Sequence, residues 1–147
     1  MSGTHVTRKP RLNHVAMSVP ADLLAQESRR ELLRFYGDVF GWEEHASETV
    51  DREILVLRVH SNEQFVFLIA DDEPMTCPPK DHFGMSVATM EELDDTLAAA
   101  RRFAATDDRV RIIDKHTDDF GVLKLTSFYC GFLLPMMIEV QHFDWDL

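Results

Sequence analysis

The sequence predicts an α+β protein built from two copies of one strand–helix–strand–strand–strand module. Three observations support this prediction: the heptapeptide NHVAMSV at 13–19 returns as DHFGMSV at 81–87, an amphipathic segment follows each copy, and β-rich runs follow each amphipathic segment. In a chain of 147 residues, such a repeat indicates one internally duplicated domain.

Each heptapeptide has the pattern of a strand with one apolar and one open face. Because side chains alternate along a strand, His14 shares its side with small residues, while apolar side chains fill the other side. The second copy repeats this pattern around His82. We expect the apolar faces to pack beneath the helices. Both histidines should then lie on the concave side of a curved sheet, among small residues that leave room for a ligand.

The segment after the first strand, residues 22–42, predicts a helix that ends at Gly41. Its apolar residues recur at helical spacing, at Leu32, Leu33, Tyr36, Val39 and Phe40. The runs at 52–59 and 64–70 are separated by the turn-like sequence HSNE, and they predict a β-hairpin that completes the first module.

The second module is predicted in the same order. Residues 89–105 predict a helix because Thr89 precedes Glu92 by the spacing of a capping box. One face of this helix is apolar, with Leu93, Leu97, Ala100 and Phe103. Three strands are expected after it, at 109–114, 122–129 and 136–143, with connections at 114–121 and 131–135.

The domain boundaries follow from this reading. Residues 1–10 are expected to form a flexible tail, and residues 11–147 a single domain with modules at 11–71 and 80–143. The linker between the modules, residues 71–80, contains three prolines.

A candidate metal site arises because Glu139, in the last predicted strand, points to the same side as the histidines. His14, His82 and Glu139 supply the elements of a 2-His-1-carboxylate facial triad, whose ligands suit Fe(II), Mn(II), Ni(II), Co(II) or Zn(II). Apolar neighbours flank Glu139, and a buried carboxylate without a partner costs several kcal/mol. A metal ion, an arginine such as Arg58, or a wet cavity would each meet this requirement.

These features resemble the vicinal oxygen chelate superfamily, which includes glyoxalase I, extradiol dioxygenases, methylmalonyl-CoA epimerase, fosfomycin-resistance proteins and bleomycin-resistance binders. The resemblance covers about residues 11–143 and rests on LNHVAMSV, FYGDVFGW, DHFGMSV and the C-terminal segments SFY and IEVQ. It implies that the two βαβββ modules form a half-open barrel of curved sheet, the glyoxalase/bleomycin resistance/dioxygenase fold. Metal ligands are then expected on the first and last strands of the modules.

The resemblance also assigns roles to single residues. It places His14, His82 and Glu139 at three ligand positions and Phe67, which cannot bind a metal, at the fourth. Three protein ligands are typical of the extradiol dioxygenases and the fosfomycin-modifying relatives. Tyr129 stands ten residues before Glu139, as a tyrosine does in the extradiol dioxygenases, and is the candidate catalytic residue.

Further side chains complete the predicted site and its surroundings. Phe67 and Gln141 are the candidate substrate-binding residues. The segment FLLP at 132–135 replaces the family's usual Asp-Pro-x-Gly turn, and it could line a hydrophobic pocket or a dimer seam. His116 is expected in a polar loop and His142 on the face opposite Glu139, both directed to solvent.

The leading hypothesis is a divalent-metal-dependent enzyme that acts on a small organic substrate chelated through two adjacent oxygens. A dioxygenase-like reaction is favoured narrowly over glyoxalase-like or epimerase-like isomerisation. The rival hypothesis is a metal-free protein of the bleomycin-resistance kind that binds or sequesters a small molecule in an aromatic groove, with Phe65, Phe67, Phe128, Tyr129 and Phe132. Either protein is expected to be a homodimer, because a second subunit would close the exposed strand edges.

The composition argues against other classes of partner. A net charge of −11 repels nucleic-acid phosphates and anionic membrane surfaces. The longest apolar run, 131–138, is far shorter than the roughly 20 residues of a membrane-spanning helix, and no secretory signal is evident near the start. Cys77 and Cys130 form no CxxC motif, so we expect a cytoplasmic protein without disulfides or a thiolate zinc site.

Overall fold

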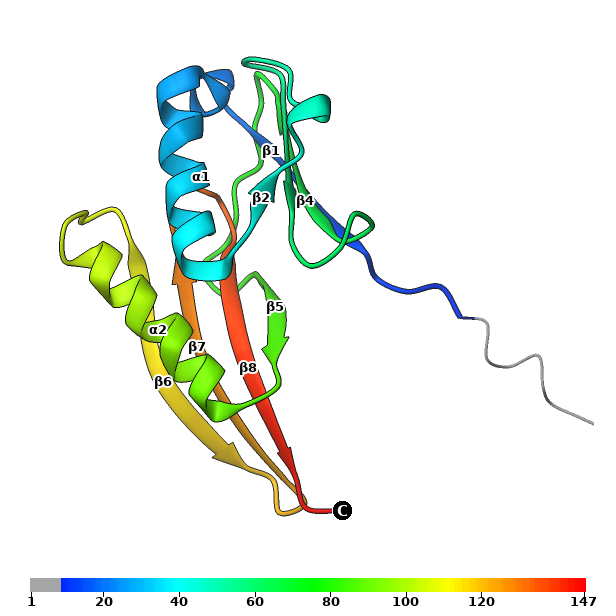
Figure 1. The fold of residues 1–147 in the computed structure, drawn as a ribbon, viewed down its shortest axis with the longest axis vertical. Helices are drawn as coiled ribbons and strands as arrows, with labels where there is room; N and C mark the ends of the chain where they lie inside the picture. Colours follow the sequence, from blue (N-terminus) through cyan, green and yellow to red (C-terminus); the bar gives the residue numbers. More distant parts are fainter. Residues whose placement is uncertain (1–8) are drawn as a thin grey trace, which may run out of the picture.

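The computed structural model describes residues 9–147 and consists of two four-stranded mixed sheets with two main helices (Figure 1). The tail predicted at 1–10 therefore falls mostly outside the described residues. Helices α1 and α2 lie on the same side of the molecule and contact each other, and each covers one face of a sheet (Figure 1).

The first module forms a sheet with strand order β1-β4-β3-β2. Its elements are β1 (His14–Val19), the short 3-10 helix η2 (Ala21–Leu24), α1 (Gln26–Phe40), β2 (Glu43–Glu44), the 3-10 helix η3 (Ala46–Glu48), β3 (Ile54–Arg58) and β4 (Phe65–Ala70). Strand β1 pairs parallel to β4, and the other pairs are antiparallel.

The second module repeats this topology with strand order β5-β8-β7-β6. Its elements are β5 (His82–Val87), α2 (Met90–Ala104), β6 (Arg111–Asp119), β7 (Leu123–Gly131) and β8 (Met137–Trp145). Here too the first and last strands pair in parallel. The predicted duplication of a βαβββ module is thereby confirmed. The two sheets remain separate and leave β1 and β5 as edge strands, so the chain forms no closed barrel.

Both helices end or begin as their local sequence predicts. Gly41 ends α1 in the left-handed conformation, with φ +71°, and its N–H donates to the Gly37 carbonyl. The Thr89 hydroxyl caps α2 by accepting the Glu92 N–H at 3.1 Å. The predicted apolar face of α2 is buried throughout. On the predicted face of α1, Leu33 and Phe40 are only half-buried, whereas Phe35, which was not predicted there, is buried.

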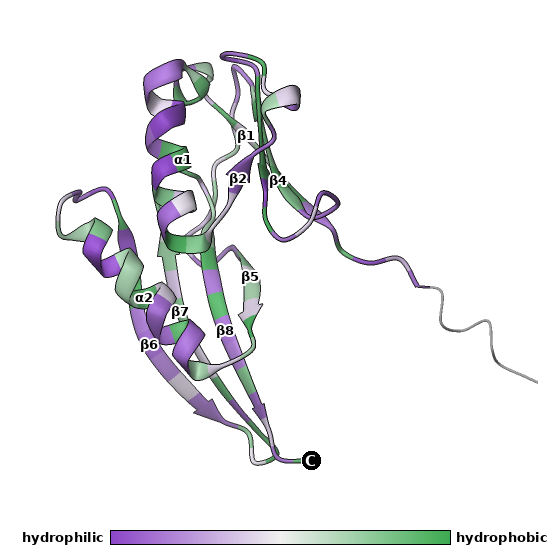
Figure 2. Cartoon of the chain, viewed as in Figure 1, coloured by the Kyte–Doolittle hydropathy of each residue, from purple (hydrophilic) through white to green (hydrophobic). Residues whose placement is uncertain are grey.

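The connection predicted at 114–121 is wrong for most of its length, because β6 continues to Asp119. Its polar composition suggested a loop, but β6 is an edge strand whose residues are mostly exposed, so polar side chains are stable there (Figure 2). Pairing with β7 holds it in place, and a bulge lies between Ile113 and His116.

The core between the modules is built around the FLLP segment, which corrects the expectation that this segment lines a pocket or a dimer seam. Phe132 and Leu134 are buried, and the Phe132 ring stacks on Phe35 of α1. The Tyr36 hydroxyl donates to the Phe132 carbonyl at 2.9 Å, and burial raises the pKa of this tyrosine. The segment therefore joins the two modules from within.

Among residues 9–147, no helix combines the length and the apolar character needed to cross a bilayer.

Candidate functional site

The structure brings His82 and Glu139 together on neighbouring strands of the second sheet. The Nε2 atom of His82 lies 3.2 Å from Oε1 of Glu139, whose side chain is only 12% exposed. The Nδ1–H of His82 donates to the Lys80 carbonyl at 2.9 Å. Because this bond occupies Nδ1, the ring presents Nε2 to the carboxylate, as second-shell hydrogen bonds orient metal-binding histidines.

Tyr129 lies directly opposite Glu139 in the β7–β8 register. Its ring meets the His82 ring edge-on, with centroids 5.1 Å apart. Partial burial and then the neighbouring Glu139 carboxylate raise the pKa of Tyr129, so its hydroxyl keeps its proton. The predicted catalytic tyrosine is thus next to two of the predicted ligands.

Beyond this pair, the same face of the second sheet changes from polar to apolar. Gln141, predicted to bind substrate, lies opposite Ser127 and extends over Gly84, where an added Cβ would be 3.1 Å from its Oε1 atom. Two apolar cross-strand pairs follow, Leu125 with Phe143 and Leu123 with Trp145. Phe143 and Trp145 are 39% and 53% exposed, so they offer an open aromatic surface.

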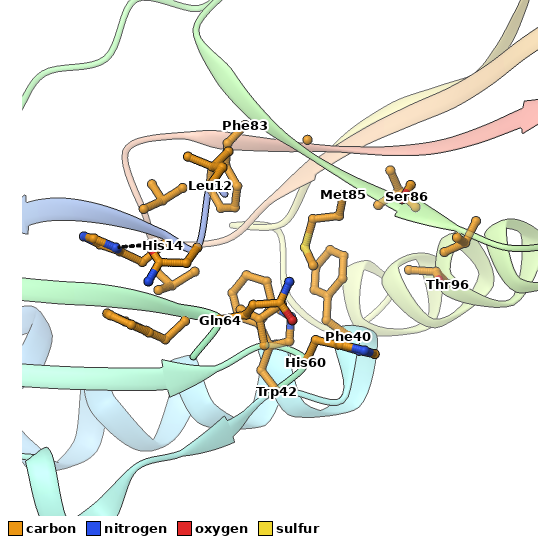
Figure 3. A pocket seen from close by; sticks show the side chains of 18 of the residues that line it. Leu12, His14, Phe40, Trp42, His60, Gln64, Phe83, Met85, Ser86 and Thr96 are labelled. Carbon is orange, nitrogen blue, oxygen red and sulfur yellow. Dashed lines mark hydrogen bonds between the residues drawn. The ribbon is translucent and has the colours of Figure 1, made fainter. Parts of the chain in front are cut away.

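His14 lies apart from the pair, on the exposed face of β1. Its ring stacks on Phe65 with centroids 4.8 Å apart, and its Nδ1–H donates to the Asn13 Oδ1 atom at 2.8 Å. It lines one end of a cleft of about 570 Å³ between the modules, which continues past Trp42 and Met85 (Figure 3).

The predicted three-ligand set is therefore divided. Within the part of the chain that the structure describes, no three His, Cys, Asp or Glu side chains are grouped closely enough to hold a metal ion. His82 and Glu139 meet, and His14 does not join them. Phe67 is half-buried on β4 beside Ala16, on the same face as His14.

Two other histidines differ from the sequence-based expectation. His116 belongs to β6 rather than to a loop, and it remains exposed, with Nε2 2.8 Å from the Asp118 carboxylate. His142 is half-buried instead of solvent-directed, and its Nδ1 atom is buried without a hydrogen-bond partner among the described residues. Strand pairing explains the first, because β6 extends further than its polar sequence indicates. His142 lies in its strand as predicted, but it is opposite Val87, which packs against the core, so the helix-facing side partly covers it.

No family model matches the sequence, and no curated protein matches it. Solved structures do match. The glyoxalase/bleomycin resistance protein/dioxygenase from Alicyclobacillus acidocaldarius matches with a TM-score of 0.63 at 13% identity, over 92% of this chain and 93% of that one. The chain therefore shares the fold of this glyoxalase/bleomycin resistance protein/dioxygenase.

Two further matches with this fold have named activities. The genomically encoded fosfomycin resistance protein FosX from Listeria monocytogenes has a TM-score of 0.60 at 12% identity, covering 92% of this chain and 94% of that one. The lactoylglutathione lyase from Agrobacterium tumefaciens has a TM-score of 0.61 at 14% identity, covering 91% and 94%. The predicted glyoxalase/bleomycin resistance/dioxygenase fold is confirmed, and at these identities the likeness concerns the fold alone.

Proposed function

We propose that this protein is a divalent-metal-dependent enzyme that acts on a small organic substrate chelated through two adjacent oxygens. The metal site would combine His82 and Glu139 of one copy with His14 of a second copy in a homodimer. The observation that carries this proposal is the close approach of the His82 imidazole to the nearly buried Glu139 carboxylate.

The geometry of the pair fits a metal ion. Ligand atoms about 2.1 Å from a common ion, at angles between 90° and 109°, are separated by roughly 3.0–3.4 Å. The 3.2 Å between Nε2 and Oε1 falls in this interval. In both repeat histidines Nδ1 is already donating, to Lys80 or to Asn13, so each ring leaves its Nε2 lone pair for a ligand bond.

Two ligands are too few for a stable site, which is the reason to invoke a second copy. His14 occupies the position in the first module that His82 occupies in the second, and it lies on an exposed face. Both β1 and β5 are edge strands with an unpaired side. Docking these edges across a twofold axis would bring His14 of each copy toward the His82–Glu139 pair of the other and form two equal sites.

The chemistry would be shared between the ion and the neighbouring side chains. A bound divalent ion supplies Lewis acidity to the chelated oxygens. Tyr129, protonated beside Glu139, is placed to hydrogen-bond a substrate oxygen, and Gln141 offers a second polar contact. The exposed rings of Phe143 and Trp145 would support an apolar body. Three protein ligands leave open positions, which favours a dioxygenase-like reaction over isomerisation.

The metal-free binder remains a second candidate because of the aromatic surfaces on both concave faces. Phe65 and Phe67 are partly accessible on β4. Phe128 and Phe132, which were also predicted to line this groove, are fully buried and cannot contact a ligand.

The cytoplasm is the expected location for either function, since Cys77 and Cys130 are both unpaired.

Co-expressed variants test the shared site directly. His14→Ala and His82→Ala homodimers should each lose bound zinc. In a heterodimer of the two variants, one site carries both substitutions and the other carries neither, so elemental analysis should find that zinc returns to one ion per dimer. A heterodimer without zinc, with a wild-type protein that binds it, would show that the sites are not shared. A monomeric wild-type protein by light scattering would also contradict the proposal.

A further inference from the structure

Arg111 lies on the concave face of the second sheet, next to the proposed metal site. It begins β6 opposite Gly131 of β7, and Ile113, two residues on, is opposite Tyr129. Since side chains alternate along strands, Arg111, Gly131 and Tyr129 share a face. The sequence alone gives no signal for this arginine, because a basic residue at the start of a strand carries no distinguishing pattern.

The side chain of Arg111 extends across β7, while the residue as a whole stays exposed to solvent. Its Nη2 atom donates to the Leu134 carbonyl at 3.0 Å. A Cβ at Gly131 would lie 2.9 Å from that atom and 2.7 Å from the Met137 sulfur, so a side chain here would displace both the guanidinium and the methionine. The absence of a side chain at Gly131 thus creates the path along which Arg111 reaches β8.

The guanidinium keeps most of its hydrogen-bonding capacity. Arginine has five N–H donors, and within residues 9–147 the Leu134 carbonyl is the acceptor found for Arg111. No carboxylate of the described residues lies within 4.0 Å of it, whereas Arg101, Arg109 and Lys115 are each paired with an acidic side chain. Arg34, Arg102 and Lys124 also have no ion pair among the described residues, and what distinguishes Arg111 is its place on the face that carries Glu139.

The distance to the proposed metal site suits one small molecule. Met137, which the guanidinium approaches, is opposite His82 and two residues before Glu139. The guanidinium and the Met137 sulfur lie 2.9 Å and 2.7 Å from the place that a Cβ on Gly131 would take, so the guanidinium lies beside the strand that carries Glu139 and pairs with that of His82. A substrate held by adjacent oxygens could therefore place another group against Arg111.

We infer that Arg111 binds an anionic oxygen group of the substrate, so that the substrate class is a chelating diol-like or dicarbonyl-like molecule that also carries a carboxylate. This inference rests on the proposed function. The planar guanidinium suits a carboxylate because it can donate two parallel hydrogen bonds. Arg111 would act as a specificity-determining residue, with the metal holding one end of the molecule and the guanidinium the other.

The test compares chelators with and without a carboxylate on the zinc-loaded full chain. The probes are catechol, 2,3-dihydroxybenzoate and 3,4-dihydroxybenzoate, measured by isothermal titration calorimetry. Arg111→Gln should weaken binding of at least one dihydroxybenzoate by roughly tenfold to a hundredfold and leave catechol nearly unchanged. Lys124→Gln is the matched control, since it removes the same charge from the opposite face of β7 and should preserve all three affinities.

The outcomes separate this inference from the proposed function. If Arg111→Gln weakens all three probes equally, the arginine only supports the Leu134 turn, and the inference is wrong. If it changes none of them, the inference is also wrong. A wild-type protein that binds no zinc would overturn the proposed function and this inference together, whereas zinc-dependent catechol binding without any effect of Arg111 on the dihydroxybenzoates overturns this inference alone.

Discussion

The two modules share one topology but differ in what they present on their concave faces. The register of the parallel strands makes the comparison residue by residue: Phe67 is opposite Ala16 in the first module, just as Glu139 is opposite Gly84 in the second. One module therefore carries a carboxylate where the other carries an aromatic ring. The helix-facing residues of both modules supply the shared apolar core, and the residues of the other face differ between the modules.

A second difference lies in the length of the strands. Strands β6, β7 and β8 have nine residues each, and they extend beyond α2 (Figure 1). Near the end of β8, Phe143 and Trp145 are exposed. The strands of the first module have at most six. The second module thus provides most of the proposed site, and the first provides one ligand and the helix that packs on the junction.

The largest expected effect comes from breaking the junction between the modules. Phe132→Ala should lower the free energy of unfolding by about 3–5 kcal/mol, because it leaves a cavity between α1 and α2. Urea denaturation followed by circular dichroism measures this. Phe120→Ala, at a 62% exposed phenylalanine of the β6–β7 turn, is the control and should change stability by less than about 0.5 kcal/mol. Equal effects of the two variants would contradict the role given to Phe132.

The next largest effect is expected at the two equivalent positions that differ between the concave faces, Glu139 and Phe67. Glu139→Gln should weaken zinc binding by at least roughly 100-fold, because the amide lacks the charge of a ligand carboxylate. Phe67→Leu, at the equivalent position of the first module, should leave zinc affinity unchanged. Competition with a chromogenic chelator measures both. Retention of full zinc affinity in Glu139→Gln would remove this glutamate from the proposed ligands.

A smaller effect is expected at the paired positions Gly84 and Ala16. A glycine within a strand usually costs roughly 0.5–1 kcal/mol relative to alanine, so Ala16→Gly should destabilise the protein by that amount. Gly84→Ala should gain almost nothing, since its Cβ would press on the Gln141 side chain at 3.1 Å. Urea midpoints of the two variants check this, and a clear stabilisation by Gly84→Ala would show that Gln141 moves aside freely.

The smallest effect concerns the ion pair between Asp107 and Arg109, just before β6. The Arg109 guanidinium lowers the pKa of Asp107 from 3.8 to about 2. Because the pKa of Asp107 is lower in the folded than in the unfolded state, its ionised carboxylate stabilises the fold at pH values above the unfolded-state pKa. This contribution is lost as the pH falls from about 4 to about 2. The stability difference between wild type and Asp107→Asn, from urea titrations at several pH values, should therefore shrink across that interval. A difference independent of pH would rule out this ionisation.

Local features of the structure could be predicted from the sequence because they depend on residues close together in the chain. The repeated heptapeptide identified the duplication, and helical spacing identified the buried face of α2. Alternation placed Glu139 on the open side of its strand and Ile138 in the core. These patterns reflect the 3.6-residue and two-residue periods of helices and strands, which act within a single element.

Only the tertiary structure decided which of these elements meet. Polar β6 is a strand because β7 pairs with it, and the FLLP segment is buried because α1 and α2 enclose Phe132. His82 reaches Glu139 through the parallel pairing of β5 with β8, while His14 belongs to a separate sheet. Such contacts join residues far apart in the chain, and their distances depend on how whole elements pack, which no local periodicity encodes.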